Sequence, residues 1–183
     1  RIAAENPQAN MIVAPSDHLI TGEAEFQNIL REGLAFVGGT EKLLTIGIRP
    51  SRPETGYGYI QIDTAPRSET EGTSICKVKT FTEKPNLEMA RVFVESGEFF
   101  WNSGIFVWSV PGILKALDTC LPDMSARFAA GKGDYRTASE QPFVDAIYPS
   151  CENISIDYGV MEKSPDVYVR CGDFGWSDIG TWG

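Results

Sequence analysis

Histidine is nearly absent from this chain, and its cysteines are few and widely spaced. The 183 residues include one histidine and four cysteines, with no C-x-x-C pair. A structural zinc site needs four histidine or cysteine ligands at short spacings, so the sequence argues against one. Disulfide frameworks are typical of much smaller secreted domains, so we expect reduced, mostly buried thiols. The cysteines are Cys76, Cys120, Cys151 and Cys171.

The scarcity of histidine also limits the catalytic chemistry. Ser-His-Asp and Cys-His sets both need a histidine as their base, and His18 is the single candidate. His18 lies next to Asp17, a setting in which a histidine more often makes a structural hydrogen bond. The sequence therefore disfavours covalent catalysis by a side-chain nucleophile.

Positive charge and long apolar runs are scarce as well. The formal net charge is −9, so a surface that coats nucleic acid or an anionic membrane is not expected. No apolar run approaches the roughly 18 residues of a membrane span, and residues 1–5 do not resemble a signal peptide. We therefore expect a cytoplasmic protein that binds any phosphate through local cations or a metal.

A Gly-rich phosphate-binding loop is missing too. Gly38 and Gly39 end a helical pattern instead of opening one, which is the wrong side for an anion at a helix N-terminus. The first pattern is the tail of a helix over 1–10, with no strand before it. We therefore expect an N-terminally truncated domain, with its first βαβ units and any C-terminal extension outside residues 1–183.

What the sequence does contain is the alternating pattern of an α/β domain. Its length and its 42% hydrophobic content suffice for one domain with a sizeable core. Met11–Ala14 and Leu43–Ile48 are apolar runs typical of strands buried on both faces, and Glu23–Val37 between them has helical spacing. This order predicts a parallel, right-handed crossover within a Rossmann-like, mixed, mainly parallel sheet flanked by helices.

The remaining elements follow from shorter patterns. Strands are expected at 59–63, 75–81 and 168–171, with an aromatic strand over 99–109 that is interrupted at 102–104. Helices are expected at 87–96, 111–121, 125–130 and 141–148. Residues 64–74 read as an exposed hairpin connection and 175–183 as a turn-rich end.

The most unusual segment is 49–60, Arg-Pro-Ser-Arg-Pro-Glu-Thr-Gly-Tyr-Gly-Tyr-Ile. Gly56 and Gly58 flank Tyr57 and lack Cβ atoms, so the backbone there can lie directly against a ligand. Tyr57 and Tyr59 offer apolar faces with hydroxyl tips, a surface that suits a sugar ring. The alternative is a Gly-rich β-corner with edge tyrosines and no ligand.

Two aspartates are candidates for a metal pair. Asp17 follows the strand expected at 11–14, and ligands of open α/β sheets bind beyond the carboxyl ends of strands. Asp178 lies in the turn-rich end. Mg²⁺ usually takes one or two carboxylates together with substrate phosphates. The structural alternative is that Asp17 caps the next helix and Asp178 makes an Asx-turn.

Three further polar residues are candidate sugar or phosphate ligands. Glu83 and Lys84 are adjacent at a strand end and would point to opposite faces of a regular strand. Glu83 could accept two sugar hydroxyls and Lys84 could neutralise a phosphate, with a solvated strand end as the alternative. Asn102 lies in an apolar stretch and needs partners, either a ligand hydroxyl or the backbone of a β-bulge.

Six motifs, in one order, resemble the mannose-1-phosphate guanylyltransferase family of sugar nucleotidyltransferases, and the resemblance runs from about Ala9 to the last residue. The motifs are Ala-Pro-Ser-Asp-His at 14–18, Arg-Pro-Glu-Thr-Gly-Tyr-Gly-Tyr-Ile at 52–60, Phe-Thr-Glu-Lys-Pro at 81–85, Trp-Asn-Ser-Gly-Ile-Phe at 101–106, Ser-Ile-Asp-Tyr-Gly-Val-Met-Glu at 155–162 and Gly-Trp-Ser-Asp-Ile-Gly-Thr-Trp at 175–182. Their agreement in order makes the resemblance specific.

The resemblance implies a reaction between GTP and mannose 1-phosphate, in which a phosphate oxygen of the sugar attacks the α-phosphate of GTP. The products are GDP-mannose and pyrophosphate, and the cofactor is Mg²⁺. It implies that Asp17 and Asp178 are the metal ligands and that Lys84 is the cation for the sugar phosphate. These three residues together are the implied catalytic group. The substrate-binding residues that it implies are Gly56, Tyr57, Gly58, Glu83, Asn102 and, in a sugar-binding or structural role, Asp157. No nucleic acid or membrane partner is implied, and a homodimer is compatible with it.

One family feature is absent from this sequence. The Gly-Gly-x-Gly-x-Arg loop, which binds the triphosphate and helps to read the base, does not occur, so we expect this chain alone to be inactive. Two other interpretations stay open: a transferase for glucose 1-phosphate with UTP or dTTP, and a non-catalytic regulatory subunit that binds a sugar phosphate. The joint presence of Asp17, Glu83, Lys84 and Asp178 argues against the regulatory subunit.

Overall fold

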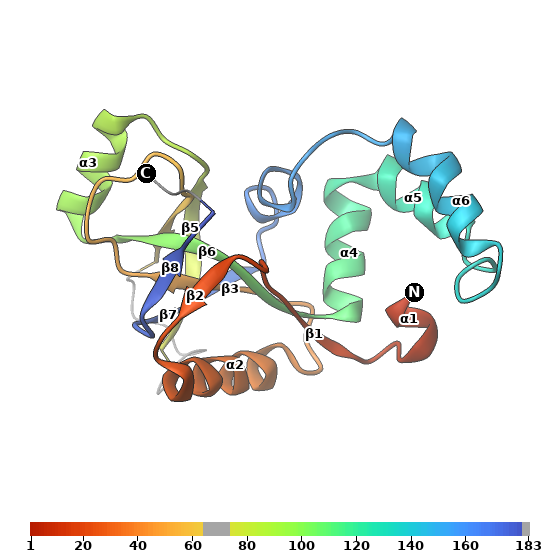
Figure 1. Ribbon diagram of the computed structural model, residues 1–183, viewed down its shortest axis with the longest axis horizontal. Coiled ribbons are helices and arrows are strands. Elements are labelled where there is room, and N and C mark those ends of the chain that lie inside the picture. Colours follow the sequence, from red (N-terminus) through yellow and green to blue (C-terminus); the bar gives the residue numbers. More distant parts are fainter. Residues whose placement is uncertain (64–73, 181–183) are drawn as a thin grey trace.

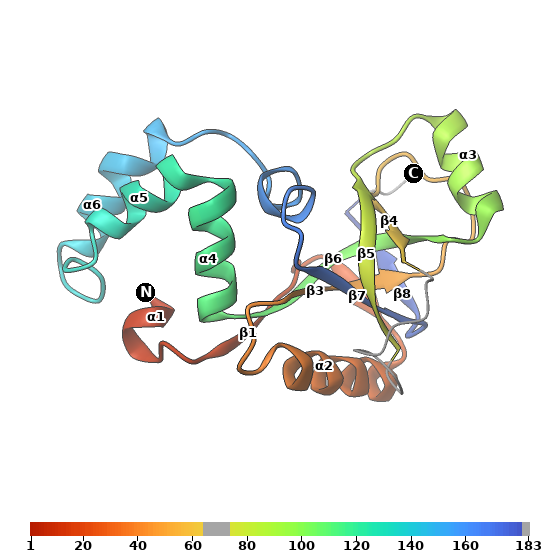
Figure 2. The ribbon, with the colours of Figure 1, turned by 180° about the vertical axis from the view of Figure 1, so that it is seen from behind.

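The computed structural model describes residues 1–63 and 74–180. A twisted sheet carries one long helix along it, and a lobe of shorter helices extends to one side (Figures 1 and 2). Apart from Ser74, the expected hairpin connection at 64–74 lies outside the described residues, as do the last three positions of the turn-rich end. Among the described residues, no helix is long and apolar enough to span a membrane.

Eight strands form two sheets within the described residues. The larger sheet has the order β1-β6-β3-β7-β5-β4, and β6 also pairs with β4; β2 and β8 form a separate antiparallel pair. The strands are β1 (Asn10–Val13), β2 (His18–Ile20), β3 (Leu43–Ile48), β4 (Tyr59–Ile62), β5 (Ile75–Thr82), β6 (Phe99–Ser109), β7 (Val167–Gly172) and β8 (Trp176–Asp178).

The larger sheet is mixed, as expected, but most of its described pairings are antiparallel. β3 and β7 pair in parallel, whereas β6 runs antiparallel to β1, β3 and β4. β1 and β3 do share one direction, yet β6 lies between them. Apolar runs report burial and not strand direction. The expectation of a mainly parallel sheet is therefore corrected for the described strands.

β1 is less buried than its apolar sequence predicts. Ile12 is 41% exposed and Val13 is 45% exposed. Within the described residues β1 pairs with β6 alone, so it forms an edge of the sheet. The expected burial of this strand on both faces is therefore wrong for the described structure.

Two of the helices begin at a capping residue whose side chain bonds the first turn. Asn86 accepts a hydrogen bond from the backbone of Met89 at the start of α3, and Ser109 does the same for Gly112 in α4. α5 begins earlier than predicted because Pro122 fits the first turn of a helix. The helices are α1 (Ile2–Glu5), α2 (Glu23–Val37), α3 (Leu87–Ser96), α4 (Val110–Cys120), α5 (Pro122–Ala130), α6 (Glu140–Ile147), the 3₁₀ turn η1 (Tyr148–Ser150) and the π-helical turn η2 (Asp157–Met161).

Two apolar clusters cover the two faces of the sheet. One holds α2 against the sheet and includes Ile29, Leu44 and Ile46. The other holds α4 and η2 and includes Leu43 and Val160. Neighbouring residues of β3 thus enter opposite clusters, as the alternation of side chains along a strand requires. This packing fixes the central strands from both sides.

The role of α2 in the core predicts a stability difference between two of its residues. Ile29 is fully buried, so Ile29→Ala should lower the free energy of unfolding by about 2–4 kcal/mol, through lost burial and a cavity. Gln27→Ala, on the exposed side of the same helix, should change it by less than about 0.5 kcal/mol. Chemical denaturation of both variants checks this, and equal losses would contradict the packing of α2.

Candidate functional site

Three of the segments that carry predicted polar groups lie where strands of one direction end. Asp17 follows β1, the segment 49–58 follows β3, and β8 follows β7. β1, β3 and β7 run in the same direction, so these three segments leave the sheet at one edge. α/β sheets bind ligands at such an edge.

Asn102 connects several parts of this edge. Its Oδ1 accepts hydrogen bonds from Thr45 Oγ1 at 2.8 Å and from the backbone of Gly104 at 3.3 Å, and its Nδ2 donates to Asp157 Oδ1 at 2.9 Å. The register between β3 and β6 shifts here, and Gly104 has a φ of +71°. The expected interruption at 102–104 is thus a bulge in a continuous strand. The Asn102 side chain thus accepts a backbone N–H of the bulge, that of Gly104, and also donates to Asp157.

Gly58 is where the backbone passes close to this group. A Cβ atom at Gly58 would collide with Glu83 Oε2 and would lie 3.3 Å from the Cβ of Asn102. The carbonyl oxygen of Gly58 accepts the backbone N–H of Asn102 at 2.8 Å. The missing side chain therefore makes the space that the Glu83 carboxylate occupies.

Glu83 and Lys84 do not point to opposite faces. β5 ends at Thr82, and Lys84 has a φ of +48°, so the alternation of a regular strand stops there. Lys84 Nζ lies 3.8 Å from Glu83 Oε1. The Glu83 side chain is 12% exposed and that of Lys84 is 62% exposed. The turn therefore presents a sheltered carboxylate beside an accessible ammonium group.

Two acidic groups of this cluster are held in an environment that disfavours their charge. Burial raises the pKa of Glu83, and the negative charges of Asp157 and Glu162 add to the rise while Lys84 opposes it. Burial likewise raises the pKa of Asp157, against the hydrogen bond from Asn102. Carboxylates kept at such a cost to folding are typical of functional sites.

Asp17 and Asp178 lie together at the neighbouring part of the edge. β2 pairs with β8 so that His18 stands opposite Asp178. A Cβ atom at Gly180 would lie 2.8 Å from Asp17 Oδ2 and 3.1 Å from Asp178 Oδ1, so both carboxylates face the same glycine. Asp178 Oδ1 accepts the backbone N–H of Gly180 at 2.8 Å, which is the Asx-turn considered as an alternative. Asp17 precedes a strand instead of capping a helix.

Tyr57 lies between the two groups. Its ring makes edge contacts with Trp101 and Trp176, at 5.3 and 5.4 Å between centroids. Burial raises the pKa of Tyr57, and the negative charge of Asp178 adds to the rise. Its carbonyl oxygen accepts the backbone N–H of Lys84 at 3.2 Å. One residue thus contacts the Lys84 turn and lies within electrostatic reach of the aspartate pair.

Three neighbouring residues serve structural purposes in this edge. Tyr59 is fully buried and its hydroxyl accepts the backbone N–H of Glu54 at 2.9 Å, so the expectation of a sugar-facing ring is wrong for Tyr59. Gly56 is exposed, and its N–H donates to the carboxylate of Glu54 at 3.3 Å. His18 Nδ1 accepts the indole N–H of Trp176 at 3.1 Å, a structural hydrogen bond as expected.

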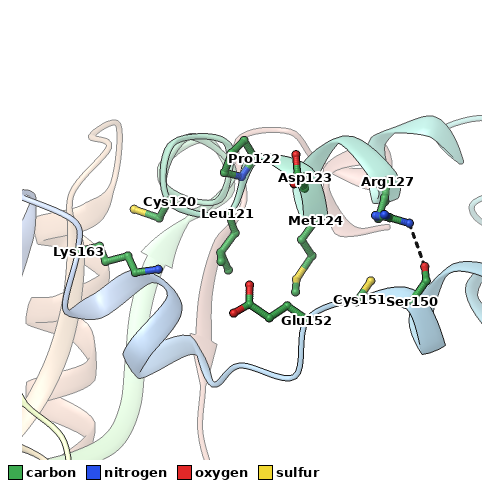
Figure 3. Close-up of a pocket in the computed structure, with 10 residues that line it drawn as sticks. All are labelled: Cys120, Leu121, Pro122, Asp123, Met124, Arg127, Ser150, Cys151, Glu152 and Lys163. Atoms are coloured by element: carbon green, nitrogen blue, oxygen red, sulfur yellow. Dashed lines mark hydrogen bonds between the residues drawn. The ribbon is translucent and has the colours of Figure 1, made fainter.

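Two cavities lie along the segment that contains η2. The first, of about 660 Å³, is lined by Glu83, Lys84, Asp157, Glu162 and Lys163 among others. The second, of about 280 Å³, lies at the corner of α4 and α5 (Figure 3). There Cys120 and Cys151 stand on opposite sides of Leu121 and Met124, and Arg127 donates to Ser150 (Figure 3). All four cysteines are half-buried and free, so they are less buried than expected.

Sequence reasoning missed several residues that build the site. Thr45 donates a hydrogen bond to Asn102, and no local pattern distinguishes it from an ordinary strand residue. Glu162 accepts the backbone N–H of Glu83 and appears in the sequence analysis only as the last residue of a motif. Trp176 was noticed only as part of a motif, although it contacts both His18 and Tyr57. The strands β2 and β8 are three residues each, which is too short for a periodic signal.

An α/β sheet that gathers a carboxylate pair and a lysine-bearing turn near the carboxyl ends of its parallel strands has the architecture of ligand-binding α/β proteins. The sequence model of the nucleotidyl transferase family matches residues 1–183. The chain belongs to this family.

Curated relatives make the likeness more specific. A mannose-1-phosphate guanylyltransferase of Sinorhizobium fredii is 38% identical over 186 aligned residues, covering 100% of this chain and 35% of the relative. One from Escherichia coli is 37% identical, covering 97% and 38%. The xanthan biosynthesis protein XanB of Xanthomonas campestris is 39% identical, covering 94% and 35%. The chain thus spans somewhat more than a third of the length of these relatives.

Solved structures share the fold. A protein of Thermus thermophilus described as a mannose-1-phosphate geranyltransferase superimposes with a TM-score of 0.83 and 28% identity, covering 98% of this chain and 49% of that one. A protein of Helicobacter pylori described as a mannose-6-phosphate isomerase gives 0.78 and 26% identity, covering 97% and 68%. The expected α/β nucleotidyltransferase fold is confirmed.

The raised pKa of Glu83 predicts how stability responds to pH. A carboxyl group whose folded-state pKa lies above its ordinary value of 4.5 destabilises the fold increasingly as pH rises from below that value through the folded-state pKa. Glu83→Gln cannot ionise, so its melting temperature relative to the parent chain should be higher at pH 7.5 than at pH 4. A relative melting temperature that is lower at pH 7.5 than at pH 4 would contradict the burial of this charge.

Proposed function

We propose that the protein containing this chain transfers GMP from GTP to mannose 1-phosphate. The observation that carries the proposal is the adjacency of two groups: an amide and carboxylate cluster with a lysine, and an aspartate pair, with Tyr57 between them. The first suits a phosphorylated sugar and the second suits a metal-bound triphosphate. The names of the curated relatives support mannose 1-phosphate and GTP as the particular substrates.

In the proposed reaction, a phosphate oxygen of mannose 1-phosphate attacks the α-phosphorus of GTP. The bond between that phosphorus and the oxygen bridging to the β-phosphate breaks, and its electron pair leaves with pyrophosphate. No protein nucleophile is required, so the chain's task is to align the two substrates and offset their charge. This agrees with the lack of a Ser-His or Cys-His set in the sequence.

The sugar phosphate is assigned to the cavity beside Lys84. Glu83 is sheltered and accepts hydrogen bonds only, so it fits two neighbouring sugar hydroxyls. The Asn102 amide has two donors, and one of them goes to Asp157, so the other fits a sugar oxygen. Lys84 Nζ is accessible and supplies the positive charge for the phosphate. In this assignment Asp157 fixes the orientation of the Asn102 amide.

Asp17 and Asp178 are the residues that would hold Mg²⁺. Their carboxylates face the same glycine from two segments, and carboxylate oxygens are the ligands that Mg²⁺ prefers. Within the described residues there is no group of three or more acidic, histidine or cysteine side chains that could hold a metal, so substrate phosphates would complete the coordination. When bound, Mg²⁺ stabilises negative charge that develops on the phosphates.

Location and assembly complete the proposal. We place the protein in the cytoplasm, and the four free thiols agree with a reducing compartment. A homodimer remains compatible with the proposal.

The metal assignment predicts the effect of a single change in β8. Asp178→Asn keeps an oxygen that can accept the Gly180 N–H, so the turn should survive while a metal ligand is lost. Turnover of GTP with mannose 1-phosphate should fall on the order of 100-fold or more. Asp173→Asn, an exposed aspartate five positions away, should leave turnover unchanged. A fully active Asp178→Asn enzyme would refute the metal role.

The close approach at Gly58 predicts a contrast between two glycines. Gly58→Ala puts a Cβ into the space of the Glu83 carboxylate, whereas a Cβ at Gly56 would lie 3.6 Å from Glu54 Oε1, an ordinary contact. We expect Gly58→Ala to weaken mannose 1-phosphate binding about tenfold or more, and Gly56→Ala to have a much smaller effect. Isothermal titration of both variants measures this. Equal effects would show that the position of Glu83 does not matter for binding.

A further inference from the structure

Lys84 holds an unusual backbone conformation for its residue type. Its φ of +48° lies in the left-handed region, and Arg136 is the other non-glycine residue in the described ranges with a positive φ. Side chains with a Cβ atom adopt this conformation at a cost in free energy, and it persists where surrounding contacts hold it. The structure must therefore supply contacts that keep the turn in place.

Two hydrogen bonds hold the peptide groups on the two sides of Glu83. The N–H of Lys84 donates to the carbonyl oxygen of Tyr57 at 3.2 Å. The N–H of Glu83 donates to Glu162 Oε1 at 3.3 Å. The first acceptor is a main-chain oxygen, so a substitution of Tyr57 does not remove it. The second acceptor is the side chain of Glu162, the residue that follows η2.

Glu162 occupies this position although its charge is unfavourable there. It lines the same cavity as Glu83 and Asp157, so three carboxylates lie around one space. A neutral surface residue would avoid that repulsion. Its Oε1 accepts the N–H of Glu83 next to the strained turn, and a hydrogen bond to an ionised acceptor is stronger than one between neutral groups.

We propose that Glu162 is a positioning residue for Lys84. By holding the N–H of Glu83, it keeps the left-handed turn and so aims the Lys84 ammonium at the phosphate of the sugar substrate. The proposal rests on the function proposed above, and it assigns to Glu162 no contact with substrate.

The test is a double-mutant cycle in the intact protein, measured by pyrophosphate release. Glu162→Ala should raise KM for mannose 1-phosphate about tenfold, with a smaller change in kcat and none in KM for GTP. Glu162→Gln keeps an acceptor oxygen and should restore most of the loss. Lys84→Ala should raise the same KM further, and adding Glu162→Ala to it should have no additional effect, because residues that act through one another are not additive.

Glu152→Ala is the matched control, because it removes the same charge from an exposed carboxylate at the second cavity. Its KM for mannose 1-phosphate should equal that of the parent protein. A similar rise in Glu152→Ala would mean that net charge and not the hydrogen bond matters. Additive effects of Glu162→Ala and Lys84→Ala would likewise overturn the proposal, as would a failure of Glu162→Gln to restore KM.

A second measurement separates this proposal from the proposed function. Amide hydrogen exchange at Glu83 should become faster in Glu162→Ala and return toward the parent rate in Glu162→Gln, whatever the substrate is. If the parent protein does not turn over mannose 1-phosphate and exchange still responds in this way, the proposed function is wrong. The conclusion that Glu162 holds the Glu83–Lys84 turn would then still be supported. Unchanged exchange in Glu162→Ala would overturn the positioning role itself.

Discussion

The hydrogen bonds of the Asn102 side chain are the constraint on which the rest of the site depends. They join three elements: Thr45 in the centre of the sheet, the bulge of β6 at Gly104, and Asp157 at the start of η2. A half-buried amide must satisfy its donors and acceptors, so these bonds leave it little freedom to rotate. The start of η2, at one wall of the larger cavity, is tied to this amide through Asp157.

Gly58 transmits that constraint to the charged turn. Its carbonyl oxygen accepts a hydrogen bond from the backbone N–H of Asn102. Because it has no side chain, the Glu83 carboxylate can occupy the place where a Cβ atom would lie. The residue before it, Tyr57, bonds to the backbone of Lys84 and contacts Trp176 in β8. The Tyr-Gly run therefore joins the bulge, the Glu83–Lys84 turn and the strand that bears Asp178. In this run Gly58 makes room for a carboxylate, whereas the ring of Tyr57 packs against other aromatic rings. An interpretation of the whole run as a surface for a sugar does not distinguish these two roles.

The fold class and most element positions could be predicted from the sequence. Long periodic segments such as α2 were predicted with the bounds that the structure has, because burial of one helical face leaves a strong pattern. Strand direction was not predictable, since β6 inserts between β1 and β3 through contacts distant in sequence. The approach of the Lys84 side chain to that of Glu83 was also not predicted, because a left-handed lysine has no sequence signal. The roles of the site residues remain predictions.

Charge explains why the two halves of the site need one another. The chain has a net charge of −9, and its larger cavity is lined by Glu83, Asp157 and Glu162 as well as by Lys84 and Lys163, so the phosphorylated sugar of the proposed reaction would approach an acidic protein. The carboxylates that suit sugar hydroxyls cannot also attract a phosphate. Lys84 supplies a local cation, and a divalent ion between Asp17 and Asp178 would supply another. Under the proposed function, an acidic protein would in this way bind two anionic substrates, with the lysine held in place and the metal present.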